Sequence, residues 1–391
     1  MRRTSWEASR SDRHDFASTR ARATSSASVS RAMDRCSSAL RSSSIRSRKM
    51  RSTVVRSTCQ ENSDADFTHI PRPPAYGGAP RLRWGSRWPS EPALAGMRRA
   101  CHLLALSGMA EPVPAFLALV APGEVAVTRS RGFEASHRFG REGTTADRYG
   151  HASRLHGHNY VVSATIAGSI DPCTHFLVDF RSLDDLLREA VAPLDHRRLD
   201  VEYTALGDRE PSTEALAVAL FGALAPHVRS RLEQARLLGV RVAENDGLWA
   251  DRREGGAVEV TRAYAFSAAH RLADPQRDDA ENRRIYGKCA NPQPHGHDYR
   301  FEVTVAGEPD PRTGLVADVK ALDEAVAARV LRLFDHRYLN AEVPPFDRVQ
   351  PTAERIAERI WELIAPDVVG LARVVVYETP RSAFAYAGPS R

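Results

Sequence analysis

The chain has 391 residues, with 55 Lys and Arg against 49 Asp and Glu, and its formal net charge is +6. This length is enough for two or three domains of about 100–200 residues each, and no run of about 18 apolar residues is present that would cross a membrane. Much of the positive excess lies in the first 60 residues, so we expect neither a nucleic-acid partner nor a membrane partner.

Residues 1–121 are expected to form a disordered leader. The first 60 of them are dominated by Arg and Ser, with few acids and no periodic apolar pattern, so they cannot bury enough surface to offset the entropy of ordering. A transit peptide, a basic tail that touches nucleic acid and a start codon assigned too far upstream are alternative explanations. A misassigned start, at Met97 or Met109, or plain disorder is favoured. The five cysteines are scattered without framework spacing, which favours a reducing compartment and a cytoplasmic protein.

The remainder of the chain contains two copies of one sequence pattern. EVAVTRSRGFEASHRF at 124–139 matches AVEVTRAYAFSAAHRL at 257–272, LHGHNYVVSATIAGSIDP matches PHGHDYRFEVTVAGEPDP, and APLDHRRLD matches RLFDHRYLN. The order is the same in both copies and the separation is nearly constant, which is typical of a duplicated domain. We therefore predict one domain at 122–250 and a second at 251–391.

The sequence of each copy predicts the order strand, loop, strand, helix, helix, strand. Its apolar residues recur with a period of two in the expected strands and at helical spacing in the expected helices. Antiparallel strands with helices packed on one face give an α+β fold, and the charged, Gly-rich segment 250–256 is expected to be the linker. The expected strands of the first copy are 125–129, 159–166 and 240–244, its helices are 182–192 and 213–235 with Ser212 or Thr213 as N-cap of the second, and the last strand of the second copy is 373–378.

A His-Gly-His sequence occurs once in each copy. On a strand, residues i and i+2 face the same side about 6.5–7 Å apart, so both imidazoles can converge on one ion. A third histidine follows the first strand of each copy, and three neutral histidines leave one coordination position open, as in catalytic zinc sites. A lone His-Gly-His would be weak evidence, but here the third histidine, an Asp-His pair and a glutamate at the end of the last strand also recur. The predicted zinc ligands are His137, His156 and His158 in the first copy and His270, His295 and His297 in the second.

Cys289 precedes the second His-Gly-His by a short loop. Its neighbour Lys288 and a bound metal both favour the thiolate, which makes the thiol a candidate general base. The alternative is that Cys289 is a small buried apolar residue.

Two further acidic positions recur in the copies. The pairs Asp195–His196 and Asp335–His336 each close a helix, where the carboxylate can orient the imidazole and raise its basicity; a solvent-facing helix end is the alternative. Glu244 and Glu378 end the last strands, where a carboxylate can accept paired donors from a guanidine-like ring edge. An ordinary charge on an edge strand is the alternative for these glutamates.

Together these motifs resemble the 6-pyruvoyl-tetrahydropterin synthase and 6-carboxytetrahydropterin synthase family: FSAAHRL, GKCANPQPHGHDY, FDHRYLN, PTAE and VYET stand in the family's order. The resemblance covers 257–388 well and 124–250 more loosely. It implies that the second-copy histidines hold zinc, that Cys289 moves protons with help from Asp335 and His336, and that Glu378 grips the pterin ring. Thr352 and Glu354 resemble the family's substrate-contacting pair.

The resemblance also implies a substrate and an assembly. The substrate would be 7,8-dihydroneopterin triphosphate, which loses triphosphate to give 6-pyruvoyl-tetrahydropterin or, in queuosine synthesis, 6-carboxy-5,6,7,8-tetrahydropterin. Five residues separate Cys289 from His295, which is similar to the pyruvoyl-forming branch, whereas the carboxy-forming branch usually has three. The family's tunnelling fold (T-fold) builds barrels with sites at subunit interfaces, so two fused copies imply a homo-oligomer, a trimer imitating a hexamer.

The first copy departs from this pattern at the cysteine. Gly150 and Ala152 lie six and four positions before His156, so this copy has no cysteine at the spacing of either branch of the family. Either His151 serves as the base, or this half is a scaffold or has altered specificity, which is the favoured interpretation. For the protein as a whole, the rival functions are a three-histidine zinc hydrolase and a non-catalytic protein that binds pterin or metal.

Overall fold

The computed structural model describes residues 115–140 and 148–390. Most of the expected leader, residues 1–114, lies outside the described residues. Its last part is described, because Ala115–Leu119 form a 3-10 helix, η2, whose Phe116 is fully buried against Ala167 and Leu238. The described fold therefore begins several residues before the domain boundary expected at 122. None of the described helices combines the length and the apolar character needed to span a bilayer.

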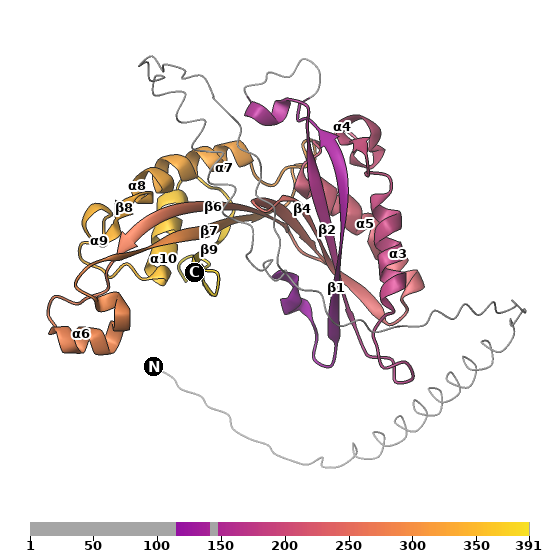
Figure 1. Ribbon diagram of the computed structural model, residues 1–391. Helices are drawn as coiled ribbons and strands as arrows, with labels where there is room; N and C mark the ends of the chain where they lie inside the picture. Colours follow the sequence, from indigo (N-terminus) through magenta and orange to yellow (C-terminus); the bar gives the residue numbers. More distant parts are fainter. Residues whose placement is uncertain (1–114, 141–147, 391) are drawn as a thin grey trace, which may run out of the picture. The chain divides into compact units, whose positions relative to one another are not determined.

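The two copies share one sheet, which has ten strands in the described residues (Figure 1). Its order is β10-β9-β7-β6-β5-β4-β2-β1-β3, and β8 pairs with β6. Neighbours are antiparallel except the two-residue strands β3 and β8, which pair in parallel with β1 and β6. The strands are β1 (Val125–His137), β2 (His156–Gly168), β3 (Arg197–Arg198), β4 (Ala235–Asn245), β5 (Leu248–Arg253), β6 (Val258–His270), β7 (His295–Gly307), β8 (Arg337–Tyr338), β9 (Leu371–Thr379) and β10 (Ser382–Tyr386).

Helices of each copy cover its strands: α3 packs against β1 and α5 against β4 and β5, while α8 packs against β6 and α10 against β9 and β10 (Figure 1). α5 also contacts β6 of the other copy. This arrangement confirms the α+β class and the tandem T-fold. The remaining elements are η3 (Gly150–Ser153), α3 (Phe180–Val191), α4 (Leu199–Glu202), η4 (Thr204–Leu206), α5 (Thr213–Arg231), α6 (Asp279–Tyr286), η5 (Gly287–Ala290), α7 (Val319–Val326), the π-helical turn η6 (Ala327–Leu331), α8 (Arg332–Phe334), α9 (Leu339–Glu342) and α10 (Ala353–Ile364).

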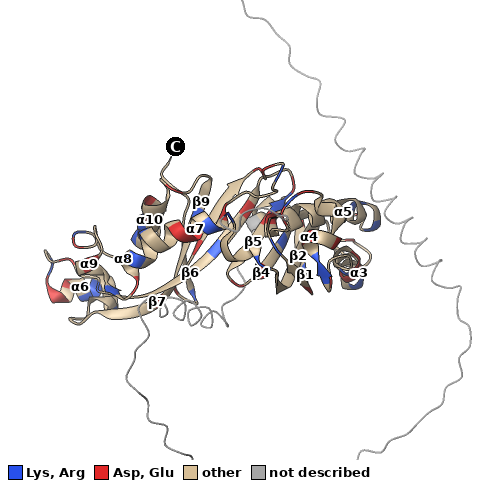
Figure 2. Cartoon of the chain, turned by 90° about the horizontal axis from the view of Figure 1, so that it is seen from above, with Lys and Arg blue, Asp and Glu red and all other residues tan. Residues whose placement is uncertain are grey.

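Side-chain caps determine where these helices begin. The carboxylate of Asp179 accepts the backbone N–H groups at 181 and 182, at 3.0 and 3.1 Å, and the hydroxyl of Ser212 accepts that of Ala215 at 3.3 Å. Such caps satisfy N–H groups that have no partner inside the helix. The outward faces carry both signs of charge, and Figure 2 shows acidic and basic residues together on α3, α7 and α10.

Alternate residues of the strands face the helices and form the core. Val162, Ala164 and Ile166 of β2 are fully buried with α3 and α5. Phe301 and Val303 occupy the same place on β7. Each such Val, Ile or Phe contributes roughly 1.5–3 kcal/mol when buried, so each repeat has its own core on the helix-facing side of the sheet.

The segment expected to be a linker, 250–256, is instead the second half of β5 and the turn after it. Asp251 is 1% exposed and accepts two hydrogen bonds from Arg241 on β4, at 2.7 and 2.8 Å, and Arg253 pairs with Glu259 on β6. Because these charges are neutralised across neighbouring strands, a charged sequence forms a buried strand here. The expected order of elements lacked β5 and its counterpart β10, and the helix expected to reach residue 235 ends at Arg231.

Candidate metal and active sites

Three histidines of the second domain meet where β6 ends and β7 begins. His270 is the last residue of β6 and lies opposite His295, the first residue of β7. His297 follows two residues later on the same face of β7, as the period of a strand requires. One ring nitrogen from each of the three lies within 4.8 Å of the others. The strand pairing thus positions three imidazoles around one point.

The first domain repeats this arrangement. His137 ends β1 opposite His156, and His158 completes a group whose nitrogens also lie within 4.8 Å of one another. The Nε2 atoms of His137 and His156 are 3.1 Å apart, and those of His270 and His295 are also 3.1 Å apart. Two nitrogen ligands of one tetrahedral zinc, at about 2.0–2.1 Å each, would be roughly 3.3 Å apart.

The hydrogen bonds on the other ring nitrogens determine which tautomer is present. His137 Nδ1 lies 2.9 Å from the carbonyl oxygen of Pro211, and His156 Nδ1 lies 2.7 Å from that of Arg154. A carbonyl only accepts, so both Nδ1 atoms donate and both Nε2 atoms carry lone pairs. Two lone pairs facing each other at 3.1 Å repel each other unless a cation lies between them, so this pair could hold a metal ion. His270 is held in the same way by the carbonyl of Pro351, at 2.9 Å.

The third histidine of each group has no hydrogen-bond partner for its inner nitrogen. Nε2 of His158 and Nε2 of His297 are buried and unpaired among the described residues. Burial lowers the pKa of His137 and of His158 to about 4, and burial also lowers the pKa of His270 and His297. All four are therefore neutral near pH 7, the form that binds metal. Both groups fit a divalent ion such as zinc.

Supporting residues of the triads were missed in the sequence. Tyr160 and Tyr299 lie on the same strand face two residues after the His-Gly-His, and the hydroxyl of Tyr160 is 3.4 Å from His137 Nε2. The hydroxyl of Tyr299 is 3.5 Å from His270 Nδ1. Burial raises the pKa of both tyrosines, so they stay neutral. The recurrence of Tyr at the same offset in both copies was the available signal.

Glu378 and Glu244 lie beside the two triads. Oε1 of Glu378 is 3.5 Å from Nε2 of His270 and 3.6 Å from Nε2 of His297. Oε1 of Glu244 is 3.3 Å from Nε2 of His158. Burial raises the pKa of Glu244 to about 7, an effect that the charge of Arg262 opposes. Each carboxylate therefore lies against the ring nitrogens that face the centre of its triad.

Cys289 lies in η5 and is partly buried. Its thiol is close enough to Glu378 and Tyr299 for the charges to interact. Burial, reinforced by the Glu378 charge, raises the pKa of the thiol, whereas the sequence argument expected Lys288 to lower it. Lys288 is exposed. In these surroundings the neutral thiol is favoured until a cation is bound nearby.

The Asp-His pairs lie at the start of the short strands β3 and β8. Nδ1 of His336 is 2.9 Å from Oδ1 of Asp335, and the same carboxylate oxygen accepts the N–H of Ser267, three residues before His270. The His336 ring is 72% exposed. Among the described residues no hydrogen bond joins this pair to the Cys289 thiol.

In the first domain, Asp195 and His196 form the same pair at 2.9 Å. Glu134 lies beside them, and the three form a third group of potential ligands. All three are exposed and are hydrogen-bonded to one another.

The N-terminus of α10 adjoins the second triad. Thr352 caps this helix by accepting the N–H of Arg355 at 3.5 Å, and it follows Pro351, whose carbonyl holds His270. Glu354 is in the first turn and is exposed. The backbone segment that holds His270 through Pro351 thus continues directly into Thr352, while Glu354 is exposed.

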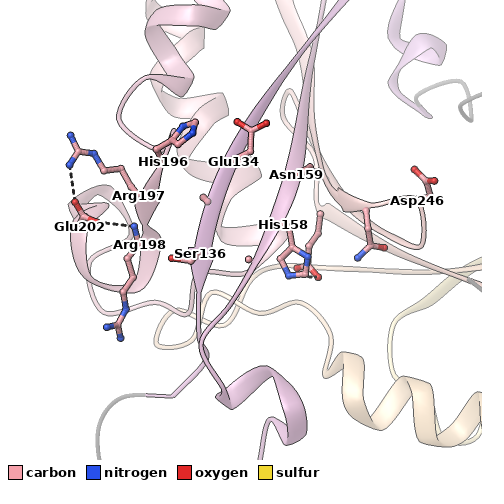
Figure 3. A pocket seen from close by; sticks show the side chains of 13 residues that line it. Glu134, Ser136, His158, Asn159, His196, Arg197, Arg198, Glu202 and Asp246 are labelled. Carbon is pink, nitrogen blue, oxygen red and sulfur yellow. Dashed lines mark hydrogen bonds and ion pairs between the residues drawn. The ribbon is translucent and has the colours of Figure 1, made fainter. Parts of the chain in front are cut away.

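The first domain has a cavity of about 850 Å³ beside its triad. Figure 3 shows it extending from Arg197, Arg198 and Glu202 across the ends of β1 and β2 to Asp246 in the β4–β5 turn. His158 and Glu244 line it, but no thiol does. His151 in η3 stands where Lys288 stands in η5 and is likewise exposed.

Comparison with known proteins agrees with the duplicated site. The sequence model of the 6-pyruvoyl tetrahydropterin synthase family matches residues 126–255 and again 259–389. The 6-pyruvoyl tetrahydrobiopterin synthase of Homo sapiens is 40% identical over 141 residues, 34% of this chain and 97% of the relative. The enzyme of that name from Drosophila melanogaster is 40% identical over 135 residues, 33% of this chain and 79% of the relative. The solved structure of Caenorhabditis elegans 6-pyruvoyl tetrahydropterin synthase is 37% identical, covers 34% of this chain and 96% of that chain, and has a TM-score of 0.33.

Proposed function

Because the chain belongs to the 6-pyruvoyl tetrahydropterin synthase family and is a lyase, we propose that its second domain converts 7,8-dihydroneopterin triphosphate to 6-pyruvoyl-tetrahydropterin with release of triphosphate. One observation carries this proposal: the thiol of Cys289 and the carboxylate of Glu378 lie beside three histidines of the second domain, where β6 ends and β7 begins. A hydrolase has no use for the thiol in this group.

The metal we propose is zinc, held by His270, His295 and His297. Nitrogen ligands with short bonds and an open fourth position are typical of catalytic zinc. When bound, zinc supplies a Lewis acid that polarises hydroxyl oxygens of the substrate side chain and acidifies the neighbouring C–H and O–H groups. The support is the 3.1 Å separation of the Nε2 atoms of His270 and His295, the Nδ1 hydrogen bond that leaves a lone pair on His270 Nε2, and the Nε2 of His297 that has no hydrogen bond among the described residues.

The other residues orient the substrate and move protons. The Glu378 carboxylate accepts paired N–H donors from the guanidine-like edge of the pterin, a strong and directional contact. Thr352 and Glu354, at the start of α10, contact the bound substrate beside it. The ring is then held so that its side chain lies over the open face of the histidines.

Cys289 is the residue that we propose exchanges protons with the substrate side chain. A base takes a proton from a side-chain carbon, and the electron pair expels triphosphate from the neighbouring carbon. A second proton is taken from the carbon beside the ring, its electron pair passes into the dihydropterin ring, and the ring is protonated, so that the ring reaches the tetrahydro level as the side chain is oxidised. The neutral thiol is the form that returns a proton, and a cation bound nearby would stabilise the thiolate that takes one. Asp335 orients His336, which assists as a second proton carrier.

The pyruvoyl product is favoured over the carboxy product. The relatives described above are named as 6-pyruvoyl tetrahydrobiopterin synthases, and the five-residue spacing between Cys289 and His295 is similar to that branch. The alternative is 6-carboxy-5,6,7,8-tetrahydropterin, the product associated with queuosine synthesis. The two products differ in mass, so one measurement separates them.

We propose that the first domain, residues 122–250, binds metal at His137, His156 and His158 but does not convert substrate. The support is the apolar Ala152 at the position of the thiol, in a site that otherwise keeps its histidines and Glu244. The catalytic unit is then the second domain, residues 251–391.

The assembly we propose is a homo-oligomer, a trimer of fused pairs that imitates a hexamer of single domains. Light scattering of the purified full chain tests it, and a stable monomer would remove it. We also propose a cytoplasmic location, which rests on the scattered cysteine spacing in the sequence.

The deciding experiment is to incubate the purified protein with 7,8-dihydroneopterin triphosphate and identify the product by mass. Release of triphosphate with a 6-pyruvoyl-tetrahydropterin mass is the expected result. Turnover by Cys289→Ala at the unmodified rate would favour a zinc hydrolase. Absence of turnover despite bound zinc would favour a non-catalytic pterin-binding or metal-binding protein.

A further inference from the structure

The turn that carries Cys289 is held by the segment 271–273, which directly follows the end of β6 and has no regular secondary structure. The N–H of Leu272 donates to the carbonyl of Cys289 at 2.9 Å. The guanidinium of Arg271 donates to the carbonyls of the next two residues of the turn, at 3.2 and 2.8 Å. Three consecutive carbonyls are thus bound by one short segment, so the position of the thiol depends on the position of that segment.

Two half-buried amide side chains hold the segment in turn. Oδ1 of Asn340 accepts the N–H of Arg271 at 2.9 Å, and Nδ2 of Asn340 donates to the carbonyl of Arg271 at 2.9 Å. Gln350 binds Ala273 in the same way, because its Oε1 accepts the N–H and its Nε2 donates to the carbonyl, both at 2.9 Å. Each amide therefore pairs with one residue as a neighbouring antiparallel strand would.

These pairs require an amide. Each side chain accepts from an N–H and donates to a C=O at the same time, which fixes the end that is oxygen and the end that is nitrogen. An ionised carboxylate of the same shape accepts but cannot donate. At the position of Asn340 it would also place a negative charge beside the carbonyl of Arg271 and attract the Arg271 guanidinium away from the turn.

The first domain has an acid at the position of Asn340. Asp200 lies four residues after the histidine of its Asp-His pair, as Asn340 does, and its carboxylate accepts two hydrogen bonds from Arg198, at 3.2 and 2.8 Å. Nε of Arg138, the counterpart of Arg271, lies 3.8 Å from the same carboxylate and has no hydrogen-bond partner among the described residues. The Nε of this arginine therefore faces the acid, whereas that of Arg271 holds the turn.

Gln350 is also replaced by an acid in the first domain. Glu210 lies directly before the proline whose carbonyl holds the first triad histidine, and it accepts the N–H of Gly140 at 2.8 Å and the hydroxyl of Tyr149 at 3.1 Å. Its carboxylate cannot also donate to the carbonyl of Gly140. Within the described residues, the domain without the thiol is thus also the domain without the two amide pairs.

We propose that Asn340 and Gln350 are positioning residues of the second-domain site, which fix the segment 271–273 and, through it, the place of the Cys289 thiol. Neither amide is a triad ligand or a group assigned to contact the substrate. The inference rests on the proposed function, because it assigns to the amides the placement of a thiol that exchanges protons there. Displacement of a reacting group by about 1 Å can cost up to 100-fold in rate, so loss of either pair slows the chemical step.

Exchange of one atom in each amide tests this placement. Asn340→Asp and Gln350→Glu are each expected to lower kcat about 10–100-fold in the full-length protein. KM for Asn340→Asp should stay within about twofold, because the groups that bind substrate are unchanged. Gln350→Met, which has no amide and no charge, should lose a similar factor, since the hydrogen bonds are what matters. Gln276→Glu, at an exposed glutamine of the same domain, is the matched control and keeps the original rate. An unchanged kcat in Asn340→Asp and Gln350→Met overturns the proposal.

A double-mutant cycle shows whether the amides act through the thiol. In a Cys289→Ala background there is no thiol to place, so adding Asn340→Asp should lower the residual rate by less than about twofold, because residues that act as a unit are not additive. Losses that multiply would mean that Asn340 supports the fold in general, and overturn the proposal. Loss of zinc from Asn340→Asp at an unchanged melting temperature would assign the amide to the triad instead, and also overturns it.

Alkylation of Cys289 tests the placement without substrate. Iodoacetamide is added to the full-length protein, and modification of Cys289 is followed by peptide mass spectrometry, which separates it from the other cysteines. Asn340→Asp and Gln350→Met should raise the rate about threefold or more, because a loosened turn exposes a half-buried thiol, whereas Gln276→Glu should not. Equal rates in all variants of a protein that turns over substrate overturn the placement and leave the proposed function intact. A raised rate in a protein that never turns over substrate supports the placement and removes the function.

Discussion

Ala152 occupies the position in the first domain that Cys289 occupies in the second. Each is the third residue of a four-residue 3-10 turn, η3 or η5. The carbonyl of Ala152 accepts the N–H of Phe139 at 2.8 Å, and that of Cys289 accepts the N–H of Leu272 at 2.9 Å. Phe139 and Leu272 each lie two residues after the first triad histidine. The backbone of the two sites is therefore the same where the side chains differ by a sulfur atom.

Removing that sulfur tests the proposed base. Cys289→Ala is expected to reduce turnover of dihydroneopterin triphosphate by about 10²–10⁴-fold, the usual contribution of a positioned acid-base group. Zinc content and thermal stability should match the unmodified protein, because Cys289 is not a member of the triad. Product formation by mass spectrometry and metal analysis on the same sample are the measurements. A rate within twofold of the original would exclude the thiol from proton transfer.

Glu378→Gln tests recognition of the pterin edge. The amide keeps the shape of the side chain but loses the charge, and a hydrogen bond to a charged group contributes about 1.5–3 kcal/mol. We expect kcat/KM to fall roughly 10–100-fold with zinc still bound. Glu308→Gln, at an exposed glutamate of the same domain, is the control for a change of one charge. Equal kinetics for the two variants would mean that Glu378 does not touch the substrate.

The buried histidines predict a pH dependence of the metal-free protein. Burial holds the pKa of His137 and His158 at about 4, below the ordinary 6.5, so the unfolded chain binds more protons than the folded one between these values. Stability is then fully present above pH 6.5 and falls as the pH is lowered toward 4. After chelation, the melting temperature should drop by about 5–10 °C across this window.

Two variants identify the origin of that pH dependence. His137→Asn removes one of the depressed groups, so the fall in melting temperature should become smaller. His151→Asn, at an exposed histidine of the same domain, should leave the fall unchanged. A melting temperature that is constant from pH 7 to pH 4 in the metal-free protein would contradict the prediction.

The site and the fold differ in how much the sequence alone could predict. The triads could be predicted from the sequence, because a strand period of two and the recurrence of one pattern in both copies leave few ways to arrange His270, His295 and His297. The strand at 250–253 could not, because its charges are compatible with a sheet only when Arg241 and Glu259 neutralise them across neighbouring strands. The direction of the Cys289 pKa was also out of reach, since it depends on burial and on Glu378, a residue far along the chain.

Asp251→Ala tests whether that segment is a buried strand. The change leaves Arg241, whose side chain is 12% exposed, without its partner, and breaking a buried pair in this way costs about 3–5 kcal/mol. Urea unfolding should show this loss. Asp185→Ala breaks the exposed pair with Arg188 and should cost about 0–1 kcal/mol. Equal losses for the two variants would mean that residues around 251 behave as a solvated linker.

Ala152→Cys tests whether the thiol is the only group that the first domain lacks for activity. In a Cys289→Ala background the second domain is silent, so any product comes from the first domain, which keeps its three histidines, Glu244 and the 850 Å³ cavity. Because η3 and η5 have the same backbone hydrogen bond, the new thiol is placed where Cys289 was. We expect turnover about 10-fold or more above the Cys289→Ala level. Ala152→Ser, which adds an oxygen of much higher pKa, is the matched control and should stay silent. If Ala152→Cys is also inactive while zinc is bound, the two domains differ in how they bind substrate. Arg197 and Arg198 in the cavity wall are then the residues to substitute next.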